Sequence, residues 1–284
     1  MLKPEIIFTV DLEDWFTDGR HITMNSWNDY ELRLESIVHR LLELLALYRC
    51  TGTFFTLGWI ARKRPRLIRL IYEMGHEIAS HGYAHELVYM LSPSQFRQDI
   101  KTSKEVLEDI IGARIRGYRA PCFSITDWGL QILEEEGFYY DSSIVPSTYH
   151  DMYSRLYTSV EHPLFPISMQ LWELSMPALG IGRAKLPWGG GGFFRLYPYS
   201  IYQYGIQAWL SSGKPFVFYI HPYDLDPGQP RQAHLSGYHY TRRYYGLQRA
   251  EHKLAKLLKQ FKGRSIVECY PFLQHREQPK RVTL

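Results

Sequence analysis

Two histidines four residues apart, His81 and His85, are the feature of this sequence that most directly suggests chemistry. Two imidazoles at this spacing can bind one metal ion when the segment between them is helical or turns tightly, and Gly82 lets the backbone turn there. The pattern is common, and among the 12 histidines of the chain a pair at the surface or at a helix end would look the same. The pair by itself therefore indicates a metal site only weakly.

An acidic cluster, Asp11-Leu12-Glu13-Asp14, strengthens that interpretation. It follows an apolar run at residues 6–10 that has the length and composition of a buried strand. Acids also favour helix N-termini, but this crowding of acids at a strand end is better explained by a ligand site. A carboxylate added to two histidines completes the ligand set of a catalytic zinc, with one position open for water. We therefore expect a divalent cofactor, Zn²⁺ first, with Co²⁺, Mn²⁺ or Ni²⁺ as alternatives.

The rest of the chain alternates short apolar runs, which we predict to be strands, with stretches of helical apolar periodicity. The predicted strands are residues 6–10, 53–57, 77–80, 115–118, 138–140, 215–220 and 265–269. The predicted helices are residues 32–47, 65–74, 93–111, 127–136, 200–211 and 247–261. This alternation is typical of an α/β fold with a parallel sheet, either closed into a barrel or open and doubly wound.

Polar residues stand at the C-terminal ends of five of these predicted strands. They are Asp11, His81 with His85, Arg119, Asp141 and His221. In a parallel barrel these ends share one rim, and the active site lies there. We therefore expect residues that are far apart in the sequence to converge on one site.

The composition excludes several classes of protein. With 284 residues, 45% hydrophobic and 22% charged, the chain can bury a large core and is not disordered, and we expect one domain over residues 1–284. The net charge of +4 is small and the basic residues are scattered, so no nucleic-acid partner is indicated. Three cysteines without metal or disulfide spacing, no export signal and no membrane-spanning apolar run predict a soluble, cytoplasmic protein.

Five short motifs resemble, in order, those of the polysaccharide deacetylases of the NodB-homology type, carbohydrate esterase family 4. They are Thr9-Val10-Asp11 with Glu13-Asp14, Ser80-His81-Gly82-Tyr83-Ala84-His85, Arg119-Ala120-Pro121, Asp127-Trp128 with Asp141, and Tyr219-Ile220-His221. The resemblance spans about residues 6–225 and leaves 226–284 as a C-terminal extension. The stretches 11–16, 188–195, His239-Tyr240 and Tyr245-Gly246-Leu247 resemble the subgroup associated with bacterial exopolysaccharide biosynthesis.

This resemblance implies a distorted (β/α) barrel, usually of seven strands, and metal-dependent removal of acetate from N-acetylated sugars. Here the barrel would carry an elaborated insertion, rich in glycine and proline, at residues 147–195. The implied roles are general base for Asp11, metal ligand for His81 and His85, orientation of Asp11 for Arg119, oxyanion stabilisation by the backbone N–H of Cys122, and general acid for His221. A carboxylate beside His221 would favour its acid role, and Asp141 or Asp127 is the candidate by position.

The third metal ligand is left open between Glu13 and Asp14. If the first strand keeps its alternation, Glu13 lies on the same face as Asp11; if the strand breaks at Leu12, Asp14 can turn inwards. Relatives that space their aspartates by one residue favour the Glu13 position, whereas the family's use of aspartate favours Asp14. We prefer Asp14.

The glycine run at residues 188–192, with Arg195 after it, has two interpretations. Its backbone could approach a sugar closely, with Trp188, Gly190 and Arg195 as substrate contacts. It could equally be a hairpin tip. The two interpretations are left open.

The expected partner is thus an N-acetylated glycan or a lipid-linked sugar precursor. The helix predicted at residues 247–261 has a basic face, which a solvated surface explains better than peripheral contact with an anionic membrane, the alternative. Two other functions are considered: hydrolysis of another C–N bond on a small molecule, as in allantoinase-like or deformylase-like relatives, and a catalytically inactive sugar-binding module. The presence of the base, the ligands and the acid argues against the inactive module. The oligomeric state is not predicted.

Overall fold

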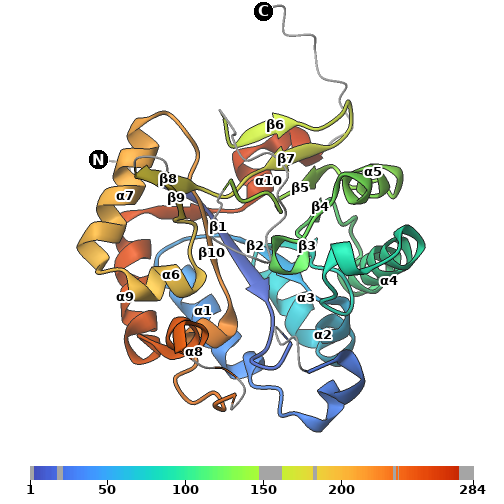
Figure 1. Cartoon of the computed structure of the whole chain (residues 1–284), viewed down its shortest axis with the longest axis horizontal. Helices are drawn as coiled ribbons and strands as arrows, with labels where there is room; N and C mark the ends of the chain where they lie inside the picture. Colours follow the sequence, from blue (N-terminus) through green and yellow to red (C-terminus); the bar gives the residue numbers. More distant parts are fainter. Residues whose placement is uncertain are drawn as a thin grey trace, which may run out of the picture.

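The computed structural model describes residues 3–17, 22–146, 162–181, 184–232, 235 and 237–274. In this part of the chain a curled sheet lies at the centre and helices pack around its outer side (Figure 1). The strands are β1 (Glu5–Leu12), β2 (Thr53–Thr56), β3 (Glu77–Ser80), β4 (Gly117–Tyr118), β5 (Tyr140–Asp141), β6 (Leu164–Pro166), β7 (Trp172–Leu174), β8 (Ala178–Ile181), β9 (Ala184–Pro187), β10 (Val217–Ile220) and β11 (Lys262–Arg264).

Helices of very different lengths follow most of the strands. The α-helices are α1 (Leu34–Leu47), α2 (Gly58–Lys63), α3 (Pro65–Glu73), α4 (Pro93–Ile111), α5 (Asp127–Glu135), α6 (Gly191–Leu196), α7 (Tyr199–Ser211), α8 (Gly237–Tyr244), α9 (Leu247–Gln260) and α10 (Ile266–Cys269). Short 3-10 helices are η1 (Met24–Asp29), η2 (Val88–Met90), η3 (Pro121–Phe123), η4 (Pro222–Leu225) and η5 (Pro271–Gln274). None of the described helices is long and apolar enough to cross a lipid bilayer.

The main sheet has the order β10-β1-β2-β3-β4-β5-β7-β6, and β11 pairs with the start of β1. The seven strands from β10 to β7 are parallel, and β6 is antiparallel to β7. The order ends at β10 on one side and at β6 on the other, so the described sheet is a curled half-barrel rather than a closed one. The predicted α/β fold of the distorted-barrel type is confirmed, with a parallel sheet that is curled into a half-barrel.

The alternation of β1 divides the core between the two faces of this sheet. Phe8 and Val10 pack in the large cluster that also contains the apolar faces of the outer helices. Ile7 packs in a second cluster with Phe55 and other residues of neighbouring strands, on the concave face. Asp11 is four residues after Ile7 on the same strand. Because side chains alternate between the two faces of a strand, Asp11 also points to the concave face.

Local sequence explains the ends of the longer helices. Helix α4 begins with a capping box, in which Ser92 Oγ accepts the N–H of Gln95 (3.3 Å) and Gln95 Oε1 accepts the N–H of Ser92 (2.9 Å). It ends at Gly112, whose φ of 67° is the left-handed conformation that suits glycine. The predicted helix at this position therefore forms with the predicted limits.

Residues 265–269, predicted as the last strand, form helix α10 instead. Ser265 Oγ accepts the N–H of Glu268, and Glu268 Oε2 accepts the N–H of Ser265 at 3.1 Å, a capping box that begins a helix. The last strand is β11, directly before it. Its sequence, Lys-Gly-Arg, has no apolar pattern from which a strand could be predicted.

Residues 147–195, predicted as an insertion, are one only in part. Residues 147–161 lie outside the described residues. Of the remainder, β7 joins the parallel sheet beside β5 and β6 pairs with β7, whereas β8 and β9 form a separate hairpin. A strand of three residues, such as β7, is too short for alternation to reveal it.

Candidate active site at the carboxyl end of the sheet

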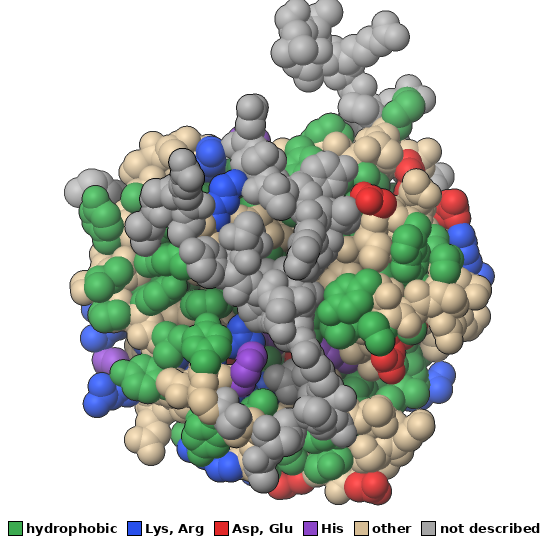
Figure 2. Space-filling model, in the orientation of Figure 1, with side chains coloured by type: hydrophobic (Ala, Val, Ile, Leu, Met, Phe, Trp, Pro, Cys, Tyr) green, Lys and Arg blue, Asp and Glu red, His purple; other side chains and the backbone are tan. Residues whose placement is uncertain are grey.

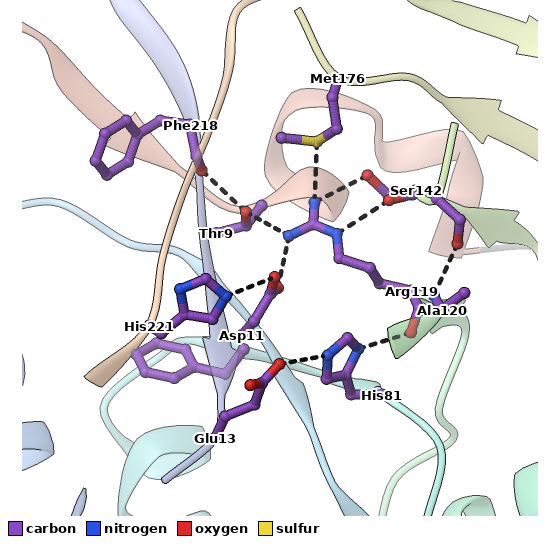
Figure 3. Close-up of polar contacts among 12 residues, drawn as sticks. Thr9, Asp11, Glu13, His81, Arg119, Ala120, Ser142, Met176, Phe218 and His221 are labelled. Carbon is purple, nitrogen blue, oxygen red and sulfur yellow. Dashed lines mark hydrogen bonds and ion pairs between the residues drawn. The ribbon is translucent and has the colours of Figure 1, made fainter. Parts of the chain in front are cut away.

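One carboxylate lies between two imidazoles at the carboxyl end of the sheet. Glu13 Oε1 is 2.9 Å from His81 Nε2 and 3.0 Å from His85 Nε2. Glu13 directly follows β1 and His81 directly follows β3, so neighbouring strands bring them together (Figure 3). Histidine side chains come to the surface near the middle of this face, with hydrophobic side chains beside them (Figure 2). Within the described ranges, these three residues are the group that could hold a metal ion.

The donor set fits a divalent metal such as zinc. Two imidazole nitrogens and one carboxylate are the ligands of catalytic zinc sites. Glu13 Oε2 is buried and has no hydrogen-bond partner among the described residues, so the carboxylate has an oxygen to offer. Burial alone would raise the pKa of Glu13, but the charge of His85 and the hydrogen bonds of both histidines hold that pKa well below its usual value. The ionised form that a ligand needs is therefore favoured.

Asp14, the preferred third ligand in the sequence analysis, lies elsewhere, and that preference is wrong. Its oxygens accept three backbone N–H groups at 2.7 to 2.9 Å, those of Trp15, Arg33 and Leu34. Asp14 thus satisfies N–H groups at the start of α1, where a carboxylate is favourable. Because β1 continues to Leu12, its alternation extends to Glu13, which faces the same side as Asp11.

A backbone carbonyl orients the first histidine. His81 Nδ1 lies 2.7 Å from the carbonyl oxygen of Arg119. A carbonyl can only accept, so Nδ1 carries a proton and Nε2 is the nitrogen that faces Glu13. The residue that follows β4 therefore also determines which nitrogen of His81 can act as a ligand.

The turn between the two histidines is held by Asp99 of α4. Asp99 Oδ2 accepts the N–H of Tyr83 (2.9 Å) and Oδ1 accepts the N–H of Ala84 (3.1 Å). Gly82 has a φ of 74°, and a Cβ there would lie 2.7 Å from Asp99 Oδ2, so the turn requires glycine. Burial raises the pKa of Asp99 to about 6. The sequence analysis missed Asp99 because nothing in α4 distinguishes it from the other acids of that helix.

Asp11 is bound by the buried guanidinium of Arg119, and the predicted contact is present. Arg119 Nη1 lies 2.7 Å from Asp11 Oδ1 and 2.9 Å from Thr9 Oγ1, so the contact uses one nitrogen and is not bidentate (Figure 3). Arg119 Nε and Nη2 donate to the carbonyl and hydroxyl oxygens of Ser142 at 3.0 and 2.9 Å. The ring of Phe55 lies 4.0 Å from Arg119 Cζ. Arg119 is therefore fixed before any ligand binds.

His221, directly after β10, approaches Asp11 from the side away from Arg119 (Figure 3). Its Nε2 is 3.8 Å from Asp11 Oδ2, and its Nδ1 is 2.8 Å from Asp224 Oδ2. Burial alone would lower the pKa of His221, but the hydrogen bond and charge of Asp224 raise it above the usual value. Burial would raise the pKa of Asp224, but Arg195 and His221 hold it below its usual range. The charged forms of both side chains are therefore favoured.

The carboxylate beside His221 is thus Asp224, and the prediction of Asp141 or Asp127 is wrong. Asp141 is buried and accepts a hydrogen bond from Ser143 Oγ at 2.5 Å. Asp127 is exposed in the first turn of α5. The sequence signal that was missed is the spacing of three residues between His221 and Asp224, across a single turn of 3-10 helix.

The glycine run packs against β10, which contradicts the predicted substrate contacts of Trp188 and Gly190. Trp188 is only 6% exposed and stacks on Tyr197 and Tyr202, with ring centroids 4.5 and 5.8 Å away. Gly190 pairs with Tyr219 of β10, and a Cβ on Gly190 would lie 1.9 Å from the carbonyl oxygen of Tyr219. The absence of a side chain at Gly190 therefore lets the backbone of this run approach the backbone of β10 closely.

Arg195, the third predicted substrate contact, is also buried. Its Nε lies 2.8 Å from Asp224 Oδ1, and its Nη1 and Nη2 donate to the carbonyl oxygens of Tyr245 (2.5 Å) and Arg242 (2.9 Å). All three nitrogens of the guanidinium thus have partners within the protein. Arg195 acts on the site through Asp224 rather than by contact with a substrate.

Cys122, the predicted oxyanion residue, lies in a backbone turn of unusual conformation. Cys122 and Phe123 have φ angles of 50° and 56°, and both are left-handed residues that are not glycine. Such strain is concentrated at functional sites. The N–H of Ala120, at the start of this turn, donates to Ser143 Oγ at 2.8 Å. The oxyanion role of the Cys122 N–H itself stays a prediction.

Comparisons with known proteins divide the chain into two matched segments. Residues 18–140 match the family model described as polysaccharide deacetylase, and residues 142–270 match the one described as domain of unknown function (DUF3473). The first segment contains both histidines of the possible metal site, and the second contains His221 and Asp224. Peptidoglycan deacetylase from Helicobacter pylori is 29% identical over 119 residues, which are 42% of this chain and 41% of that protein. The match thus spans less than half the length of this curated relative.

Two solved structures show the same fold. That of a candidate polysaccharide deacetylase from Mycobacterium smegmatis has a TM-score of 0.61 at 20% identity and covers 96% of this chain and 95% of its own. That of a CE4 family pseudoenzyme from Bacillus anthracis has a TM-score of 0.50 at 13% identity and covers 93% of this chain and 65% of its own. Because a pseudoenzyme shares the fold, the fold alone does not establish turnover.

Proposed function

We propose that the chain is a metal-dependent hydrolase of the polysaccharide deacetylase family, which removes N-acetyl groups from a glycan or glycan precursor. The family match over residues 18–140 and the peptidoglycan deacetylase relative support this reaction class. The observation that carries the proposal is geometric. A Glu-His-His group, an Arg-bound aspartate and an Asp-bound histidine converge at one end of the sheet.

Glu13, His81 and His85 would hold the divalent ion, and we propose zinc because imidazole nitrogen with one carboxylate suits zinc better than calcium or magnesium. When bound, such an ion supplies a Lewis acid that polarises the acyl oxygen and eases the deprotonation of water. The orientation of His81 by the Arg119 carbonyl presents Nε2 as its ligand atom.

Hydrolysis of the amide needs one group that takes a proton and one that gives a proton. Water adds to the acyl carbon and loses a proton, the C–N bond breaks, and the amine nitrogen gains a proton as acetate is released. Asp11 Oδ2 and His221 Nε2 are 3.8 Å apart, so the two groups can act on the same acyl group.

Asp11 is the proposed general base. Arg119 holds Oδ1, which leaves Oδ2, on the side of His221, to take the proton of water. Because Thr9 and Ser142 fix the guanidinium, Asp11 needs no reorientation during the reaction. The backbone N–H of Cys122 is the proposed donor to the oxyanion of the tetrahedral intermediate.

His221 is the proposed general acid, which gives its Nε2 proton to the departing amine. The Asp224 carboxylate, on Nδ1, stabilises the imidazolium, and the raised pKa of His221 increases the protonated fraction near neutral pH. Arg195 holds the other oxygen of Asp224 and so determines where that carboxylate points.

We further propose one catalytic unit over residues 1–284, with a cytoplasmic role in surface-polysaccharide biosynthesis. The shared sheet and site of the two matched segments support a single unit. The exopolysaccharide role and the lipid-linked precursor rest on the resemblance of residues 11–16, 188–195, 239–240 and 245–247 to that subgroup. Lys253 is not part of a free basic face, because its Nζ donates to the carbonyl oxygens of Phe194 and Tyr197.

Acetate release from N-acetylated oligosaccharides tests the proposal directly. We expect chelated enzyme to be inactive and added Zn²⁺ to restore acetate release, with Co²⁺ and Mn²⁺ as comparisons. Full activity of enzyme shown to be free of metal would exclude the proposed mechanism. Tight binding of the glycan without acetate release would identify an inactive sugar-binding module. Release of formate from an N-formyl sugar, or ring opening of a cyclic amide, would identify the small-molecule hydrolase.

A further inference from the structure

Two buried acids, Asp141 and Glu173, take no part in the mechanism described above. They are register partners on the adjacent parallel strands β5 and β7, and both are fully buried. The charge of Asp141 acts on Glu173, so the two carboxyls are close enough to interact electrostatically. Two ionised carboxylates in this position would repel each other in a medium that solvates neither. Their protonation therefore needs an explanation.

In each of these acids one carboxylate oxygen accepts a hydrogen bond and the other accepts none from the described residues. Asp141 Oδ1 accepts from Ser143 Oγ at 2.5 Å, and Glu173 Oε1 accepts from the N–H of Ile144 at 2.9 Å. Asp141 Oδ2 and Glu173 Oε2 are buried and receive no hydrogen bond from any donor among the described residues. A single proton between the two groups would satisfy both oxygens and remove one of the two charges.

The electrostatic surroundings agree with one proton on the pair. Burial raises the pKa of Asp141 to about 6 and that of Glu173 well above its usual value, where the charge of Asp141 raises it further. The charge of Arg119 lowers the pKa of both carboxyls. Tyr118 is a neighbouring titratable group, and the charge of Asp141 raises its pKa. At neutral pH the pair would carry one negative charge.

Ser143 links Asp141 to the segment that contains Arg119. Ser143 Oγ donates to Asp141 and accepts from the N–H of Ala120 at 2.8 Å. Next to it, the carbonyl and hydroxyl oxygens of Ser142 accept from Arg119. Residues 142–144 therefore form a support that contacts the acid pair on one side and residues 119–120 on the other.

We propose that Asp141 and Glu173 share a single proton and act as positioning residues, which hold residues 142–144 so that Arg119 orients Asp11 and Ala120 leads correctly into the Cys122 turn. The positioning role rests on the proposed function. The shared proton does not, because it can be observed without any substrate.

Amide variants distinguish this arrangement from its alternatives. In D141N or E173Q the new NH₂ group can donate to the remaining carboxylate and so replace the shared proton, whereas D141N/E173Q sets two NH₂ groups against each other. We expect each single variant to keep most of kcat and the double variant to lose about 100-fold in kcat, as for a displaced catalytic group, with KM and metal content unchanged. Equal kcat in the single and double variants would overturn the positioning role.

A second variant covers the case in which the double variant does not fold. S143A breaks the link between the acid pair and Ala120 without changing either acid. We expect a lower kcat with unchanged KM and metal content. Wild-type kcat in S143A would overturn the positioning role.

The shared proton is tested by infrared spectroscopy of the protein without substrate at neutral pH. We expect the carbonyl band of a buried, protonated carboxylic acid in the wild type and in S143A, and its loss in D141N and in E173Q. The control is E77Q, which alters another poorly exposed carboxyl, held by Thr53 and Tyr140, and should keep the band. A wild type without the band, or a band lost only in E77Q, would overturn the shared proton even if the enzyme proves active.

Discussion

The metal-ligand cluster (Glu13, His81 and His85) and the acid corner (Arg195, His221 and Asp224) are built in different ways. The cluster uses side chains that directly follow β1 and β3, with one tight turn that carries the second histidine. The acid corner depends on an ion pair between α6 and η4, whose partners are 29 residues apart in the sequence. The first depends on backbone pairing and the second on the packing of side chains from separate elements.

This difference means that the two regions can be disrupted separately. Changes to the cluster should remove the metal, whereas changes to the acid corner should alter proton transfer and leave the metal in place. Asp11 lies between the two regions and belongs to neither, because Arg119 holds one of its oxygens and the other faces His221.

The largest effect is expected from D11N. Without a general base, kcat should fall by about a thousandfold or more. Bound metal, measured on the purified protein, should match the wild type because Asp11 is outside the metal-ligand cluster. Turnover close to that of the wild type would remove Asp11 from the role of base.

A comparison of E13A with D14A tests the corrected ligand assignment. E13A removes a ligand and should raise the Kd for Zn²⁺ by at least about 100-fold, measured by calorimetry. D14A should bind Zn²⁺ normally and lose about 1 kcal/mol of unfolding free energy, because it removes a partner of N–H groups at the start of α1. Loss of metal from D14A but not from E13A would restore the original preference for Asp14.

D224N should lower kcat by about 100-fold at neutral pH with metal content unchanged. The Asp224 carboxylate raises the pKa of His221, so loss of that carboxylate should lower the pKa. His221 would then lose its proton at a lower pH than in the wild type. The alkaline limb of the kcat profile should therefore move to lower pH. A shift in the opposite direction would contradict the role of Asp224.

R195Q separates position from charge within the acid corner. Removal of a cation beside Asp224 should not lower the pKa of His221, so the alkaline limb should stay or move to higher pH. The Asp224 carboxylate, no longer held by Arg195, should still misplace His221 and reduce kcat by about tenfold. If R195Q instead reproduced the pH shift of D224N, Arg195 would not be acting by position.

An effect as small as that of R195Q is expected from D99N in the turn of the metal-ligand cluster. One of the two N–H acceptors would become a donor, and the Kd for Zn²⁺ should rise by about tenfold. The matched control is E105Q, an exposed acid of the same helix, which should leave the Kd unchanged. Equal Kd values for the two variants would show that Asp99 does not position the turn.

The outcome for individual residues shows how far the sequence could be interpreted. Asp11, His81, Arg119 and His221 were predicted at strand ends, and parallel pairing of those strands brings them into one site. The carboxylate partner of His221 was predicted wrongly, because Asp141 follows a strand in the same manner as the others and Asp224 does not. A pattern of strand ends therefore cannot find a partner supplied by a turn.

The glycine run illustrates the same limit. Glycines at residues 189–192 indicate a close approach of backbones, but the sequence does not say whether a sugar or another strand makes that approach. The structure places Tyr219 of β10 against Gly190 and buries Trp188 behind it. The close approach was predictable, and its partner was not.

The amino-acid sequence by itself determined the alternation of strands and helices, the parallel sheet and the chemical types of the base, the histidine ligands and the acid. These follow from local periodicity and from the position of polar residues at strand ends. The tertiary structure alone decided between Glu13 and Asp14, paired His221 with Asp224 and Arg195, and set Asp141 against Glu173. Those choices depend on where β1 ends and on which side chains meet across elements, and neither is encoded in the spacing of residues along one segment.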